Sequence, residues 1–211
     1  MRTTGLSLNQ NDILRVNQAV AAAEQGTSGE IIPVVVPQSS DYREVAYLGG
    51  LTGALVAYFL AIYFAHVDSA SRVLGTLAAG YLAGLLVSRM AAVKRLLIGR
   101  RFSEEEVWRR AALEFHLNHA HRTAARTGIV ILLSVLERMV VVYADQPIAV
   151  KVSQGEWDEV KDTIIGGIQR GQPAEGLVDG IAACGRILAE HFPIQPGDRN
   201  ELPNHLVLRD A

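Results

Sequence analysis

The stretch of residues 45–65 constrains this chain more than any other feature, because its 21 residues include no charged side chain. At a rise of about 1.5 Å per residue, a helix of this length matches the roughly 30 Å hydrocarbon core of a bilayer. A second apolar block, residues 73–88, reaches a similar length by continuing to Val93, with Arg89 extending toward the lipid headgroups. Soluble helices rarely stay uncharged on every face for so long. The pattern therefore predicts two membrane-spanning helices rather than a buried helical hairpin in a soluble core.

The two apolar blocks are separated only by residues 66–72, so they are predicted to form an antiparallel transmembrane hairpin, which we assign to residues 44–93. Small residues recur along one side of each predicted helix and would let two helix backbones approach closely in lipid. They are Gly49, Gly53 and Ala57 in the first helix and Gly80 and Gly84 in the second. The lipid bilayer is the predicted partner of these helices. Their small residues are compatible with packing inside one hairpin, against a second copy of the chain, or against another membrane protein.

The distribution of charge predicts how the hairpin is oriented. The connecting segment carries only Asp68 and Arg72, whereas five basic residues follow the second apolar block. They are Arg89, Lys94, Arg95, Arg100 and Arg101. An excess of Lys and Arg marks the cytoplasmic side, so both termini are predicted to be cytoplasmic. Residues 93–101 either lie on the anionic inner leaflet or form a solvated linker.

Composition argues against several classes of partner. Lys and Arg together number 20 against 22 Asp and Glu, so no nucleic-acid partner is predicted. Cys184 is the single cysteine, which rules out an internal disulfide and a multi-thiolate zinc site. The first twelve residues lack the apolar core of a secretory signal, so contact with lipid is expected from internal segments.

The more polar segments alternate helix and strand patterns. Residues 1–43 contain an amphipathic helix and then a continuous β-branched strand at 30–37, in which Pro33 indicates a sheet edge or a bulge. Residues 94–193 contain a helix, two strands at 129–135 and 139–144, and two further helices; residues 194–211 form an extended tail. This order predicts an α/β fold, with a small mixed β-sheet covered by helices and the membrane hairpin inserted into its first crossover.

Four stretches resemble the TPM domain family. They are TSGEIIPVVVPQSSDY at 27–42, HRTAARTGIVILLSVLERMVVVYADQPI at 121–148, EW at 156–157 and NELP at 200–203. The family includes chloroplast, bacterial and animal members, among them photosystem II repair proteins, and this chain is most similar to its branch of bacterial membrane proteins. The resemblance implies a TPM-like α/β sandwich and a multi-pass protein of the bacterial inner (plasma) membrane. Members have been described as acid phosphatases, as calcium-binding domains, and as accessory or assembly factors.

The resemblance also indicates where a site would lie. The family's metal-binding arrangement places Asp-Asn-Gly before the second strand and an acidic residue after the third. Here these positions hold Arg126, Thr127, Gly128 and Asp145. A guanidinium in place of a carboxylate opposes calcium binding, so neither a metal ion nor another cofactor is predicted at this cluster. The register of the expected hairpin brings Arg126 and Asp145 to the same end of the sheet.

This cluster has two interpretations. As a ligand site, Arg126 would hold a phosphate or carboxylate and Asp145 would act as acid or base. As a structural pair, the two side chains would pin the strand ends, which we favour because no nucleophile accompanies them. We therefore expect a non-catalytic binding or assembly module, and the alternative is a membrane-tethered phosphatase or hydrolase using Asp145 and Arg126.

Two further patterns are weaker. His116 and His119 are expected on one face of a helix, a spacing compatible with two metal ligands, but neither a third ligand nor an HExxH motif accompanies them. They are therefore predicted to be partly exposed helical histidines. Glu137 and Arg138, in the turn of the expected hairpin, are predicted to be solvated turn residues with a possible interaction role.

Overall fold

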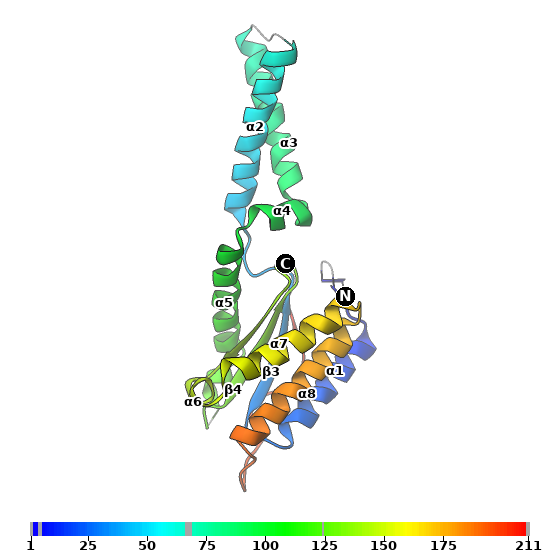
Figure 1. Cartoon of the computed structure of the whole chain (residues 1–211), viewed down its shortest axis with the longest axis vertical. Helices are drawn as coiled ribbons and strands as arrows, with labels where there is room; N and C mark the ends of the chain where they lie inside the picture. Colours follow the sequence, from blue (N-terminus) through cyan, green and yellow to red (C-terminus); the bar gives the residue numbers. More distant parts are fainter. Residues whose placement is uncertain (1, 4–5, 66–68, 124, 210–211) are drawn as a thin grey trace. The chain divides into compact units, whose positions relative to one another are not determined.

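The computed structural model of the chain describes residues 2–3, 6–65, 69–123 and 125–209 (Figure 1). They divide into two compact units, one of residues 1–39 and 104–211 and one of residues 40–103. The second unit contains the expected hairpin, 44–93, together with short segments on both sides of it. Residues 66–68, which belong to the connecting segment used to predict the orientation, lie outside the described residues.

The larger unit is built on a mixed four-stranded sheet in the order β5-β4-β3-β6. Its strands are β3 (Glu30–Val36), β4 (Gly128–Ser134), β5 (Met139–Ala144) and β6 (Val207–Leu208). β3 runs parallel to β4 and β6, and β4 and β5 form an antiparallel hairpin. The predicted α/β class, the small mixed sheet and the parallel first crossover are thereby confirmed. A separate two-stranded sheet joins β1 (Arg2–Thr3) and β2 (Leu6–Ser7).

Pro33 does not mark a sheet edge, because β3 is an inner strand. Even-numbered residues of β3, such as Glu30 and Val36, make backbone hydrogen bonds on the side of β4, so Pro33 turns its nitrogen toward β6. On that side β6 pairs only with Val34 and Val35. The missing N–H of Pro33 therefore removes no hydrogen bond from the ladder with β4.

Three helices cover one face of this sheet: α1 (Gln10–Glu24), α7 (Gln154–Gln169) and α8 (Pro173–His191) (Figure 1). Capping boxes begin two of them, made by Asn9 with Asp12 in α1 and by Ser153 with Glu156 in α7. Their apolar stripes pack into one core with the odd-numbered residues of β3. The helical part of that core includes Val16, Val20, Val160, Ile164, Leu177, Ile181, Cys184 and Leu188.

The opposite face is covered by α5 (Arg100–Leu117), through its residues Val107, Ala111 and Phe115, and by the short 3₁₀ helix η1 (Ala120–Arg122). These side chains pack on the even-numbered residues of β3 and on β4. A one-and-a-half-turn helix, α6 (Gln146–Lys151), follows β5 directly. The sheet is thus buried between two helical layers, as the sequence pattern predicts.

The C-terminal segment, expected to be an extended tail, is instead fastened into the fold. Residues of β6 extend the sheet, and the backbone N–H of Arg209 donates to the carbonyl of Val35. The Arg209 guanidinium pairs with Glu114, with Nη2 and Oε2 2.8 Å apart. Glu114 is fully buried and also accepts hydrogen bonds from Arg110 and Asn118. The Glu114 carboxylate, in α5, therefore holds the C-terminal segment in place through Arg209.

The smaller unit is a helical hairpin of α2 (Arg43–Ala65) and α3 (Ala70–Ser88), followed by α4 (Ala91–Leu97). The small residues predicted to permit close helix packing face each other within this hairpin, which is one of the arrangements that the sequence left open. A Cβ atom on Gly84 would lie 2.1 Å from the carbonyl oxygen of Gly49, and one on Gly53 would lie 2.4 Å from that of Gly80. A Cβ built on Gly80 would also lie 2.5 Å from the Cβ of Ala57. Only glycine permits this approach of the two backbones.

The segments before α2 and after α3 pack together at the base of the hairpin. Lys94 Nζ donates to the carbonyl of Asp41 at 3.0 Å and lies 5.3 Å from the centroid of the Tyr42 ring. Tyr42 is buried and contacts the ring of Phe102 edge to face. These contacts explain why the unit extends beyond 44–93 on both sides.

Both long helices of this unit present apolar side chains outward. Residues 43–64 of α2 and 70–88 of α3 are long and apolar enough to cross a membrane. In each helix an apolar stretch of 18 residues is almost entirely exposed, with only 11% of it buried in α2 and 6% in α3. Phe59 and Tyr63 are examples, with 66% and 75% of their surfaces exposed. The helices therefore do not form the interior of a soluble core.

Candidate functional site

Arg126 and Asp145 lie at the end of the sheet where β4 begins and β5 ends, as the expected register predicts. Arg126 Nη2 is 3.2 Å from Asp145 Oδ1, and Arg126 Nε is 3.3 Å from Oδ2. The Asp145 side chain is 5% exposed and that of Arg126 is 62% exposed. The pair therefore joins a buried carboxylate to a largely solvated guanidinium.

Every residue of the cluster has a structural contact. Asp145 caps α6, because its Oδ1 accepts the backbone N–H of Gln146 at 2.7 Å. The Thr127 hydroxyl donates to the carbonyl of Ser28 at 2.6 Å, which ties the starts of β3 and β4 together. A Cβ on Gly128 would lie 2.1 Å from a backbone carbonyl of η1. Both Asp145 oxygens and the Thr127 hydroxyl thus make hydrogen bonds within the protein, which is consistent with the structural interpretation.

Replacing Asp145 separates capping from ion pairing. Asp145→Ala removes both, and we expect it to lower the free energy of unfolding by about 1–2 kcal/mol. Asp145→Asn keeps an oxygen that can accept from Gln146, so we expect a loss below about 1 kcal/mol. Urea unfolding of the full chain in detergent micelles, followed by the fluorescence of Trp108 and Trp157, measures both, because these two tryptophans belong to the larger unit. Equal losses in the two variants would contradict the capping role.

The two histidines singled out from the sequence do not share a helical face. His116 lies in the last turn of α5, but that helix ends at Leu117, and His119 has a left-handed backbone with φ of 60°. Both side chains are exposed, and each ring lies near that of His121. Within residues 2–3, 6–65, 69–123 and 125–209, no three acidic, histidine or cysteine side chains converge as metal ligands would.

A second polar cluster lies at the other end of β4, in the turn between β4 and β5. Glu137 Oε1 accepts from the backbone N–H of Ser39 at 2.9 Å and from its hydroxyl, and Oε2 accepts from the Ser134 hydroxyl at 2.5 Å. Ser134 is fully buried and Ser39 nearly so. Glu137 is therefore not the solvated turn residue that its position predicts. It fastens the hairpin turn to the chain that leaves β3.

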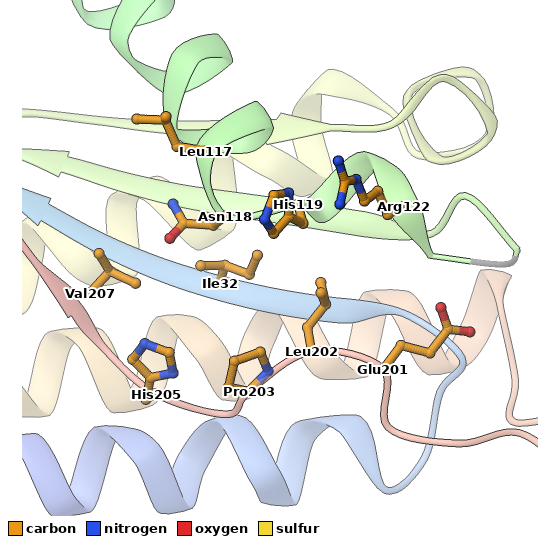
Figure 2. Close-up of a pocket in the computed structure, with 10 residues that line it drawn as sticks. All are labelled: Ile32, Leu117, Asn118, His119, Arg122, Glu201, Leu202, Pro203, His205 and Val207. Carbon is orange, nitrogen blue, oxygen red and sulfur yellow. The ribbon is translucent and has the colours of Figure 1, made fainter.

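A groove of about 430 Å³ opens beside β3, between the end of α5 with η1 and the C-terminal segment (Figure 2). Ile32 forms its floor, and His119 and Arg122 lie along one rim. Glu201 and His205 come from the opposite rim. Small-molecule sites have this size, an apolar floor and a few polar groups, so the groove is a candidate ligand site. Its residues were missed because they meet only when the C-terminal segment folds against η1.

A larger hollow of about 660 Å³ follows the open edge of β5. Trp108 from α5 and Trp157 from α7 stand on its two sides, and all six residues of β5 line it. An open strand edge with aromatic walls is suited to an extended peptide.

Two glutamates border the start of β3: Glu30, its first residue, is buried, and Glu24, the last residue of α1, is partly buried. Glu24 Oε1 accepts the backbone N–H of Ile31 at 2.8 Å, and Glu30 Oε1 accepts that of Glu201 at 2.9 Å. The second oxygen of each carboxyl group is buried without a hydrogen-bond partner. Burial raises the pKa of Glu24 to about 8, and burial likewise raises the pKa of Glu30. The two side chains hold the C-terminal segment and the start of β3 together, and Glu24 keeps its proton at neutral pH.

Glu24→Gln is therefore expected to stabilise the protein in alkali. Because the folded-state pKa of Glu24 is about 8, its contribution is complete below the ordinary value of about 4.5 and is lost as the pH rises through 8. Glutamine mimics the protonated acid, so we expect a gain of about 1–2 kcal/mol at pH 9, allowing for partial exposure, and none at pH 5. Urea titrations at both pH values test this, with Glu190→Gln on the exposed face of α8 as the control. A gain of equal size at pH 5 would contradict it.

No protein-family model matches this chain, and no curated protein matches it. Among solved structures, the chain is similar to the NMR structure of BA42 protein from the psychrophilic bacterium Bizionia argentinensis, with a TM-score of 0.60 and 23% sequence identity. The alignment covers 96% of this chain and 95% of that one. At this identity the likeness concerns the fold.

Proposed function

We propose that this chain is an inner-membrane protein of the TPM domain family, whose α/β unit faces the cytoplasm and serves as a binding or assembly module. The observation that carries the proposal is the outward apolar surface of α2 and α3. Only 11% of the apolar stretch of α2 is buried, and only 6% of that of α3. Exposing two helices of this length to water would be costly, whereas lipid satisfies them. Both ends of an antiparallel hairpin return to one side, so the two chain segments of the α/β unit can meet there.

The family assignment is supported by where the four resembling stretches lie. They include β3, the β4-β5 hairpin and the capping box of α7. The fourth, at residues 200–203, contacts the first through the hydrogen bond from Glu201 to Glu30. Segments distant in sequence therefore support one another around a single sheet.

A binding role is favoured over hydrolysis by the contacts of the Arg126 and Asp145 cluster. Asp145 accepts from Arg126 and from the first N–H of α6, so its oxygens are occupied without a ligand. A general acid or base needs access to the proton that it transfers. The groove beside β3 and the open edge of β5 are better suited to a ligand or partner, since both are accessible.

Membrane anchoring is tested by washing vesicles with alkaline carbonate and by fusing a reporter to the C-terminus. We expect the chain to stay in the pellet and the reporter to be cytoplasmic. Release of the intact chain by carbonate, or an external reporter, would reject the anchored, inward-facing arrangement. If the chain stays in the pellet, affinity purification from native membranes would identify the proteins that bind it.

The alternative, a membrane-tethered phosphatase, is tested on the purified full chain with a panel of phosphomonoesters. We expect no turnover above that of a mock preparation. Robust turnover that is abolished by Asp145→Asn, a variant expected to remain folded, would replace the binding role by hydrolysis.

A further inference from the structure

The region around α4 combines basic residues with exposed apolar ones. From Ser69 to Ser103 the sequence contains no Asp or Glu, while five basic residues lie between positions 89 and 101. Near the base of the hairpin, Asp41 is paired with Arg43, with Nη2 and Oδ2 3.0 Å apart. The basic residues after α3 therefore give this end of the smaller unit a positive charge.

α4 is amphipathic and its apolar side is open. At 100° per residue, Val93, Leu96 and Leu97 fall on one side of the helix, opposite Lys94 and Arg95. Leu96 is 84% exposed and Leu97 is 50% exposed. The preceding Met90 is 59% exposed. A soluble surface rarely gathers such side chains in one place, which indicates that something apolar covers them.

The rotation of α4 is set by Lys94. Its ammonium group donates to the carbonyl of Asp41 and lies over the ring of Tyr42, so it holds the polar side of α4 against the chain that enters α2. Within the same unit, α4 runs crosswise to α2 and α3 at the end of the hairpin (Figure 1). This is the geometry of a helix that lies in the plane of a membrane interface.

We propose that α4 and the residues flanking it form a binding surface for anionic phospholipid headgroups. The inference rests on the proposed anchoring of α2 and α3 and deepens it by naming the lipid class. Leu96 and Leu97 enter the boundary between headgroups and acyl chains. The guanidinium groups of Arg89, Arg95 and Arg101 attract the negatively charged phosphates of the lipid headgroups. Lys94 is a positioning residue, since its ammonium group is already engaged within the unit.

The test compares two brominated lipids as quenchers of a fluorophore on Leu96→Cys. The full chain is placed in nanodiscs of phosphatidylcholine and phosphatidylglycerol at 7:3, with bromine on one lipid or on the other. Cys184 does not interfere, because it is fully buried and burial raises the pKa of its thiol to about 12. We expect the ratio of phosphatidylglycerol to phosphatidylcholine next to the label to exceed the bulk ratio at least fivefold, since one basic side chain near an anionic surface is worth about a factor of five.

Two variants make the result specific. In Arg89→Gln/Arg95→Gln/Arg101→Gln this enrichment should fall to about one, whereas Arg186→Gln, an exposed change in the larger unit, should leave it unchanged. Enrichment near one in the unmodified chain, or no quenching by either lipid, overturns the proposal. A second label on Phe59→Cys, in the middle of α2, distinguishes rejection of the α4 surface from failure of membrane insertion. If both lipids quench that label but not the one at position 96, the hairpin is inserted and only the α4 surface is rejected; if neither label is quenched, anchoring itself fails.

Discussion

Gly84→Leu is expected to separate α3 from α2. Even a single Cβ atom at this position would lie 2.1 Å from the carbonyl oxygen of Gly49 and 3.1 Å from the Cα of Gly50, and backbone atoms of a helix cannot move aside as a side chain can. Overpacking a close contact costs about 1–3 kcal/mol, and the rest of the leucine side chain raises the cost to about 3 kcal/mol or more.

The distance between spin labels on Leu51→Cys and Leu82→Cys measures this separation, since both positions are exposed on α2 and α3. We expect a narrow distance distribution in the parent hairpin and a longer, broader one in Gly84→Leu. Gly75→Leu is the matched control on the same helix, because a Cβ there meets nothing within 4 Å. If Gly84→Leu leaves the distribution unchanged, the glycine contact does not hold the hairpin together.

Glu114→Ala is expected to have the largest effect in the larger unit, lowering the free energy of unfolding by about 3–5 kcal/mol. The substitution leaves the guanidinium groups of Arg110 and Arg209 without the buried carboxylate that they share. It also releases β6, which Arg209 follows directly. Urea unfolding monitored by tryptophan fluorescence measures the loss, and Glu105→Ala, an exposed change on the same helix, should alter the stability by less than about 0.5 kcal/mol.

The same network has a defined dependence on pH. Burial opposes the charged form of Glu114, but hydrogen bonds and charge from Arg209 and Arg110 outweigh it, so the pKa of Glu114 lies below its ordinary value. Its contribution is present above the ordinary value of about 4.5 and is lost as the pH falls. The difference between the parent chain and Glu114→Ala should therefore shrink in acid. A difference that stays constant down to pH 3 would contradict the ion-pair network.

Features that depend on local pattern could be predicted from the sequence. The buried strand before the apolar hairpin, the β4-β5 hairpin and the capping box of Ser153 with Glu156 each involve residues close together along the chain. The contact between Arg126 and Asp145 could be predicted as well, since the hairpin register alone brings the ends of β4 and β5 together.

Features that depend on distant segments could not be predicted. β6 has two residues and leaves no periodic signal, so the C-terminal segment looks like a tail. Glu137 is polar and lies in a turn, and only the return of Ser39 to the same end of the sheet shows that its carboxylate is a partly buried hydrogen-bond acceptor. Glu24 likewise looks like an ordinary residue of a helix end until Ile31 and the C-terminal segment surround it. In each case a tertiary contact overrides the expectation that the local sequence gives.

The long interval between β3 and its neighbour β4 has a consequence for biosynthesis. All seven residues of β3 are buried in the finished protein, yet β4 begins only at Gly128, after α2, α3 and α4 have been made. Chains emerge from the ribosome N-terminus first, at about 5–20 residues per second, so this β-branched strand waits several seconds for its partner. Under the proposed membrane insertion, any factor that delivers the helical hairpin to lipid acts on a nascent chain whose sheet has not yet closed. A chaperone that shields residues 30–36 during that interval would protect the chain from aggregation.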